Sequence, residues 1–368
     1  MKKIIAWLVA IIVVAGIAFL GWRNHQSMKP TSGKPVVKIG IMLPLTGPAA
    51  EPAENAKKAI AIALDEAKDS PLYFDIIMEN DTLASARAAV IANKFIHMDK
   101  VQSIVSSYSS SGNVVSPVAD RAKILHIGIC NDTNVAKGDL NYTNWQIPEI
   151  TVKRMVDFLL EKQVKKVVLF RMYHIGFEKL TDEFKKQAKE RGIQIAEFGY
   201  MPDNRDFSLT VYKASRERDA DYWMLLALPP SLELIRREMI RKNITTPVTG
   251  IQTIGESRNP ALFEGSYFSD PPDGSKDFLD KMSAQTQSKQ LSLAAYFYDT
   301  VKLLIKLNED FYRETGRVAT STELGEKLNQ VKNYQGVVGT LIMAEGGIMQ
   351  SPSVLKQIQN GKAVVVDK

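Results

Sequence analysis

The chain has 368 residues, 45% of them hydrophobic and 24% charged, which suffices for two globular domains and argues against disorder. Its net charge of +6 does not indicate nucleic-acid binding, because residues 1–35 hold five cations and no acid, leaving 42 cations against 41 acids beyond them. The single cysteine, Cys130, excludes an intrachain disulfide, and the four scattered histidines lack metal-ligand spacing. We therefore expect no metal and no cofactor.

The N-terminus reads as an export signal. Lys2 and Lys3 precede an uninterrupted apolar run from Ile4 to Trp22, which at ~1.5 Å per residue is long enough to cross a bilayer core. Two interpretations stay open: a cleaved signal peptide, with residues 16–18 as the best small-residue site, or an uncleaved membrane anchor. Both predict that the chain from about residue 36 is periplasmic or tethered to the outer face of the cytoplasmic membrane, with residues 24–35 as a flexible tether.

Beyond residue 35, strand-like and helix-like segments alternate, which predicts βαβ units with parallel sheets. The expected strands are 36–43, 73–79, 101–105, 124–129, 166–170, 193–199, 222–227, 247–250 and 266–269. The expected helices are 51–68, 85–98, 113–122, 150–163, 176–191, 207–218 and 230–242. So many strands indicate two α/β lobes, with the break near residues 144–148.

After residue 270 the alternation stops. Helices are expected at about 275–286, 290–314 and 321–331, followed by a terminal β segment. This order predicts a first lobe of residues 36–145 and 270–333 and a second lobe of 146–269 and 334–368, joined by three crossings that form a hinge. No G-x-G-x-x-G, P-loop, G-x-S-x-G or H-E-x-x-H motif is present, so we expect no catalytic residue and no enzyme.

Two polar segments are candidate ligand contacts. Residues 106–113 are rich in serine and lie between an expected strand and an expected helix, where hydroxyls and free backbone N–H groups suit an anion. The alternative is a loop that only caps its own helix. Residues 130–134 follow the next strand and either reach the same ligand or form an Asx turn.

Five segments together resemble the type I periplasmic solute-binding proteins of the leucine-binding kind, the branched-chain amino acid receptors of ABC importers. They are 39–48, the serine-rich segment with Val118 and Ala119, 131–133, 294–299, and 336–343 with Gly346 and Gly347. The resemblance spans nearly everything after residue 35. It implies two lobes with parallel sheets that close on one small solute, a monomer, and an ABC permease as partner.

Carried over by position, the resemblance implies most of the site residues, and Tyr108 and His174 are added because they lie near the ends of expected strands. The expected ligand-binding residues are Tyr108, Ser109, Ser110, Ser111, Asn131, Thr133, His174, Ile175, Leu228 and Gln252. The serines match those that hold a ligand carboxylate, and 131–133 match a loop that contacts both ligand ends. Pro52, Ile175 and Leu228 stand where family members often have an aromatic residue, and Gln252 stands where an acid commonly receives an α-ammonium.

The glutamine matters for the ligand, because a cation desolvated without a counter-charge costs several kcal/mol. We therefore expect an amide, a small carboxylic acid or another amino-acid-like polar metabolite before a standard branched-chain amino acid. Arg171 and His174 either favour an acid or are solvated, and Tyr108 and Tyr296 either stack on the ligand or pack in the core. The predicted function is a solute receptor that delivers its ligand to a permease. The alternative is a sensory receptor of the same fold acting through a partner protein.

Overall fold

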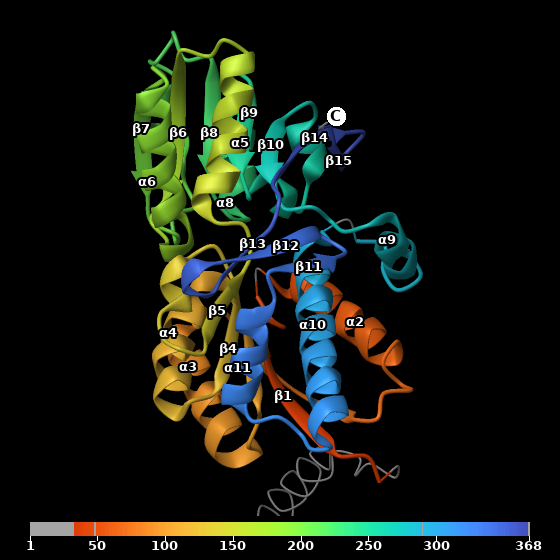
Figure 1. Cartoon of the computed structure of the whole chain (residues 1–368). Helices are drawn as coiled ribbons and strands as arrows, with labels where there is room; N and C mark the ends of the chain where they lie inside the picture. The colour runs from red at the N-terminus through yellow and green to blue at the C-terminus, as the bar shows by residue number, and fades with distance from the viewer. Residues whose placement is uncertain (1–32, 48, 289, 367–368) are drawn as a thin grey trace, which may run out of the picture.

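A computed structural model describes residues 33–47, 49–288 and 290–366, and the predicted leader lies outside these residues. The described chain forms two α/β lobes, one above the other in Figure 1. The predicted fold class is therefore confirmed. No helix within the described ranges is long and apolar enough to cross a membrane.

The first lobe contains an eight-stranded sheet covered by helices on both faces. Its strands, in spatial order, are β11 (Asn333–Gly336), β12 (Gly339–Ala344), β13 (Ile348–Gln350), β5 (Asn141–Asn144), β4 (Leu125–Ile129), β3 (Ser103–Ser107), β1 (Val36–Leu43) and β2 (Tyr73–Asn80). Its main helices are α2 (Ala50–Asp65), α3 (Ser85–Lys94), α4 (Tyr108–Ala122), α9 (Lys276–Ser283), α10 (Ser292–Thr315) and α11 (Ser321–Gln330). Strands β1 to β5 are parallel to their neighbours in that group.

The second lobe is a seven-stranded sheet in the order β15-β14-β10-β9-β8-β6-β7. Its strands are β6 (Lys166–Met172), β7 (Gln194–Tyr200), β8 (Tyr222–Leu226), β9 (Val248–Ile251), β10 (Tyr267–Asp270), β14 (Val354–Gln359) and β15 (Lys362–Val365). Its helices are α5 (Pro148–Glu161), α6 (Ile175–Glu190), α7 (Ser208–Ala214) and α8 (Ser231–Arg241). Because β6 to β10 are parallel, their carboxyl ends share one edge of the sheet.

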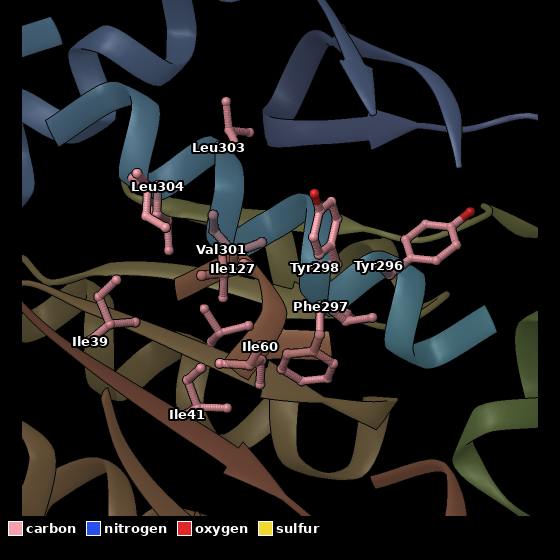
Figure 2. Packing of buried hydrophobic residues seen from close by; sticks show 14 of the residues in the cluster. Ile39, Ile41, Ile60, Ile127, Tyr296, Phe297, Tyr298, Val301, Leu303 and Leu304 are labelled. Carbon is pink, nitrogen blue, oxygen red and sulfur yellow. The ribbon is translucent and has the colours of Figure 1, made fainter. Parts of the chain in front are cut away.

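Alternation along β1 explains how the first lobe is layered. Ile39 and Ile41 belong to the core that packs against α2 and α10, and Figure 2 shows Ile41 near Ile60 of α2 and Phe297 of α10. Gly40 faces the other way, where an added Cβ would lie 2.6 Å from the Phe95 ring. Helix α10 lies against α2 although it follows α5 to β10 of the second lobe in sequence, so the chain has returned to the first lobe as predicted.

The position at which the chain last passes from the first lobe to the second differs from the prediction. β13 pairs in parallel with β5, so the segment from β11 to β13 extends the first-lobe sheet, and only β14 and β15 join the second. Placing residues 334–350 in the second lobe was wrong. The reason is a contact with α10: the Asp299 carboxylate accepts the backbone N–H groups of Val337 (2.8 Å) and Val338 (3.0 Å), which fixes this hairpin to the first lobe.

Three segments cross between the lobes, at 145–147, 271–275 and 351–353. Gln146 of the first crossing connects all three crossings. Its Nε2 donates to the carbonyl of Asp270 (3.3 Å), the residue just before the second crossing, and to the carbonyl of Pro352 in the third crossing. Tyr296 at the start of α10 hydrogen-bonds Ser351 and packs against Trp145 with the two rings tilted and their centroids 4.4 Å apart. The crossings therefore behave as one packed unit next to the cleft.

Candidate ligand-binding cleft

A cavity of about 100 Å³ lies between the lobes at the carboxyl ends of their strands. It is lined by Tyr108, Ser109, Ile129, Cys130, Asn131, Trp145, His174, Gly176, Phe177, Leu180, Leu228, Gln252, Glu256, Asp270, Ser292 and Leu293. Both lobes and the first crossing contribute. This is the position in which open α/β sheets bind small ligands.

The first-lobe wall is formed by the start of α4. The helix begins at Tyr108, earlier than predicted, because residues 106 and 107 continue β3 and Tyr108 then turns the chain with a left-handed φ of 63°. Ser109 consequently lies in the first turn of a helix, not in a loop, and its hydroxyl donates to Asn131 Oδ1 at 3.1 Å. The N-terminus of α4 still presents backbone N–H groups suited to an anion.

The second-lobe wall centres on Gln252, which also adopts a left-handed φ, of 55°. Its Oε1 accepts hydrogen bonds from Trp145 Nε1 (3.1 Å) and Asn131 Nδ2 (3.4 Å), and its Nε2 donates to Gln146 Oε1 (3.4 Å). The amide is thus bound by the first lobe and the first crossing. Backbone strain at two facing positions is typical of a functional site.

Six of the ten predicted site residues line the cavity: Tyr108, Ser109, Asn131, His174, Leu228 and Gln252. Their role in binding stays a prediction. His174 Nδ1 accepts the Gly176 N–H (3.1 Å) and so caps α6, and burial lowers the pKa of its imidazole.

The other four do not line it. Ser111 donates to Asp81 Oδ2 (2.6 Å), and the Ser110 hydroxyl is buried with no hydrogen-bond partner among the described residues. Thr133 accepts from Lys179 beside the cavity (3.2 Å), and Ile175 is 41% exposed. The helical geometry of α4 explains the serines, because Ser110 and Ser111 turn away from the face that carries Ser109.

Two other predicted candidates also lie elsewhere. Arg171 pairs with Glu197 (3.3 Å) and lies over the Tyr173 ring, so it does not provide a cation for an acidic ligand. Tyr296 is fully buried in the first-lobe core. An aromatic residue nevertheless lines the cavity close by, since Phe177 lies two positions after Ile175.

Sequence reasoning missed the acids of the cleft. Glu256 and Asp270 line the cavity, so a cationic ligand would find a counter-charge there. The inference from Gln252, that a cation in the cleft would have no counter-charge, therefore does not hold. Burial raises the pKa of Glu256 to about 7 and that of Asp270 to about 6. The only sequence signal was the position of each acid at or soon after the end of a second-lobe strand.

The lobes also contact each other beside the cavity. Lys179 Nζ lies 3.0 Å from Asp132 Oδ1, and Asn131 Nδ2 donates to the carbonyl of Gly176 at 3.2 Å. Although burial alone would raise it, the pKa of Asp132 is held below its usual value by hydrogen bonds from Asn113 and Asn134 and by the Lys179 ammonium. These contacts join the two lobes beside the cavity.

A Ser–His–Asn line in the first lobe superficially resembles a catalytic triad. Ser106 Oγ lies 2.8 Å from His126 Nε2, and His126 Nδ1 lies 3.1 Å from Asn141 Oδ1. All three residues are buried, none lines the cleft cavity, and burial lowers the pKa of His126 to about 4. A neutral, inaccessible imidazole of this kind is a structural hydrogen-bonding group.

A profile of the periplasmic binding protein family matches residues 36–363. The chain belongs to this family. Periplasmic binding proteins bind substrates and are not enzymes, which confirms the predicted absence of catalysis, and the family implies an extracytoplasmic location. A search of curated protein sequences gave no match.

Solved structures of other periplasmic binding proteins share the fold. The leucine-binding protein LivK from Thermotoga maritima has a TM-score of 0.79 at 19% identity, covering 90% of this chain and 98% of that one. LivJ from Streptococcus pneumoniae, in complex with isoleucine, has a TM-score of 0.79 at 19% identity, and the match covers 90% of this chain and 100% of that one. A solute-binding protein from R. palustris, in complex with benzoate, has a TM-score of 0.80 at 14% identity, and the match covers 90% of this chain and 95% of that one.

Proposed function

We propose that this protein is the extracytoplasmic solute receptor of an ABC importer. It closes two lobes on one small polar metabolite and presents the closed complex to a permease in the inner membrane. It acts as a monomer, and its only membrane attachment is the N-terminal segment. The observation that carries the proposal is a cavity whose walls come from both lobes and from a crossing segment.

Closure of this kind is a population shift, because a ligand favours the closed state only if it contacts both lobes. Here Ser109 and Asn131 belong to the first lobe and Phe177 and Gln252 to the second, and all four line one cavity. The hydrogen bonds of Gln252 to Trp145 and Asn131 connect this cavity to the first crossing and to the opposite lobe. A bound solute therefore adds to contacts that already favour closure.

The cavity indicates a small ligand with an apolar body. A cavity of about 150 Å³ holds a benzene-sized molecule, and this one is about 100 Å³. Phe177, Leu180, Leu228 and Leu293 provide apolar walls, while Ser109 and the start of α4 provide donors. An amino-acid-like compound, an amide or a small carboxylic acid has this combination of groups, as do isoleucine and benzoate, which are bound to structurally similar proteins.

Thermal-shift screening against amino acids, amides, short-chain acids and aromatic acids would identify compounds that stabilise the folded protein. Small-angle X-ray scattering should then show compaction with each stabilising compound and none with inactive members of the panel. Unchanged dimensions with every compound that binds would refute the hinge mechanism. Recovery of a sensor kinase instead of a permease in a membrane pull-down would favour the sensory alternative.

A further inference from the structure

A buried lysine lies where the second crossing leaves the second lobe. The side chain of Lys356, in β14, is 1% exposed, and its ammonium lies 2.8 Å from Asp270 Oδ2 and 2.9 Å from Asp273 Oδ1. Asp270 is the last residue of β10, and Asp273 belongs to the second crossing, 271–275. A desolvated ammonium requires such partners, so the lysine holds the crossing against the second-lobe sheet.

The same group of side chains extends to the first lobe. Ser292 is the first residue of α10. Its hydroxyl donates to Asp273 Oδ1 at 2.7 Å and accepts from Lys356 Nζ at 3.4 Å. We call Asp273, Ser292 and Lys356 the hinge cluster. Its members come from the second crossing, the first lobe and the second lobe, so a rotation of one lobe relative to the other changes the distances within the cluster.

The backbone of the second crossing requires a restraint of this kind. Gly274, directly after Asp273, has a φ of 112°, a conformation that glycine adopts readily and other residues rarely adopt. Glycine also leaves the backbone dihedral angles free to vary, as residues that absorb hinge motions do. The Asp273 side chain therefore fixes the crossing at a point where its backbone does not.

The hinge cluster also borders the solute cavity. Its three members line a small cavity of about 20 Å³, which shares Asp270 and Ser292 with the solute cavity. The small cavity has room for about one water molecule, so a solute does not reach Lys356 or Asp273. A solute affects these two residues only through Ser292 and Asp270 in the wall of its own cavity.

We propose that the hinge cluster sets the angle between the lobes and thereby the spacing of the two walls of the solute cavity. The inference rests on the proposed receptor function and adds a group of positioning residues to it. Asp273 and Lys356 do not line the solute cavity, so they influence binding only through the arrangement of the lobes.

The test compares the wild-type protein with Asp273→Ala, which removes the acceptor of both bonds, and with Ser292→Ala, which removes only the hydroxyl. Asp273→Asn retains an acceptor oxygen and tests for rescue. Asp277→Ala is the matched control. Asp277 is an acid of α9 whose side chain is 83% exposed, and its partner Lys281 (2.9 Å) lies on the same helix.

The first readout is the interlobe distance in the absence of solute, measured by double electron–electron resonance between spin labels at Asn134 and Glu178, exposed residues of the two lobes. Loss of a charge-assisted hydrogen bond predicts about a tenfold change in the ratio of interlobe arrangements, seen as a broader distance distribution in Asp273→Ala and Ser292→Ala. Asp273→Asn should broaden the distribution less, and the control not at all.

Ser292→Ala keeps both ion pairs of Lys356, so it provides the comparison even if Asp273→Ala does not fold. Distributions of these two variants that superimpose on that of the wild type would overturn the inference.

The second readout is the affinity for a solute selected by thermal shift. Its Kd should rise by about tenfold in Asp273→Ala, because fewer molecules have the lobe arrangement that fits the solute. An unchanged Kd in that variant would also overturn the inference. A wild-type distribution that responds to no bound solute would instead refute the receptor mechanism, while the comparison of the solute-free proteins would still decide the role of the hinge cluster.

Discussion

The ion pair between Lys179 and Asp132 should stabilise the closed state relative to the open state. It joins α6 of the second lobe to the segment after β4 of the first, and the same ammonium also donates to Thr133 at 3.2 Å. Replacing Lys179 with methionine keeps the aliphatic stem and removes only the charge. The closed state should lose this contact while the open state, in which the lobes separate, loses nothing.

The burial of the two side chains sets the magnitude. The Asp132 side chain is 6% exposed and that of Lys179 is 38% exposed, so we assign the pair about 1 kcal/mol, the upper end for exposed ion pairs. That energy corresponds to about a fivefold change in the ratio of closed to open protein. Because interface changes act mainly on dissociation, the bound solute should leave about fivefold faster.

Stopped-flow dissociation of a solute selected by thermal shift would measure this effect. Lys186→Met is the matched control, since Lys186 lies on the same helix and pairs with Glu183 (3.2 Å) within one lobe. A double-mutant cycle with Asp132→Asn should give a coupling of about 1 kcal/mol. Equal dissociation rates for Lys179→Met, Lys186→Met and the wild type would show that the Lys179–Asp132 ion pair does not contribute to closure.

Three further predictions concern stability. Lys356→Met leaves the buried Asp270 and the half-buried Asp273 without their cation and should cost about 3–5 kcal/mol in urea denaturation, with partial recovery on adding Asp270→Asn. Gly40→Ala forces a Cβ against Phe95 and should cost about 1–3 kcal/mol in the same assay; an unchanged midpoint would contradict the packing. Burial lowers the pKa of His126 to about 4 from 6.5, so its contribution is complete above pH 6.5 and falls by roughly 3 kcal/mol as pH drops to 4; NMR titration should show an imidazole that stays neutral at pH 5.

The regular part of the fold was predictable because strand and helix periods are local properties. β1 coincides with the predicted 36–43, and the break between lobes falls at 145–147. The position at which the chain last passes to the second lobe was not predictable. β11 to β13 belong to the first lobe because of long-range contacts with Asp299 and β5. Sequence spacing carries no information about such partners.

The site was predictable only in part, for a related reason. Polar residues directly after strands, such as Asn131 and Gln252, lie in the cavity because strand ends converge there. Glu256 and Phe177 escaped prediction because their directions depend on how the chain enters the helix after each strand, a short 3-10 helix for Glu256 and the first turn of α6 for Phe177. Trp145 was recognised as part of the break between lobes, but its contact with Gln252 exists only once the lobes meet.

The central claim, that two lobes close on one solute, is tested most directly by an interlobe distance. Spin labels at Asn134 of the first lobe and Glu178 of the second, both exposed, would report it by double electron–electron resonance. Cys130 should stay unlabelled, because it is buried and burial raises the pKa of its thiol to about 12. Saturating solute should shorten and narrow the distance distribution, whereas identical distributions with and without bound solute would contradict the account.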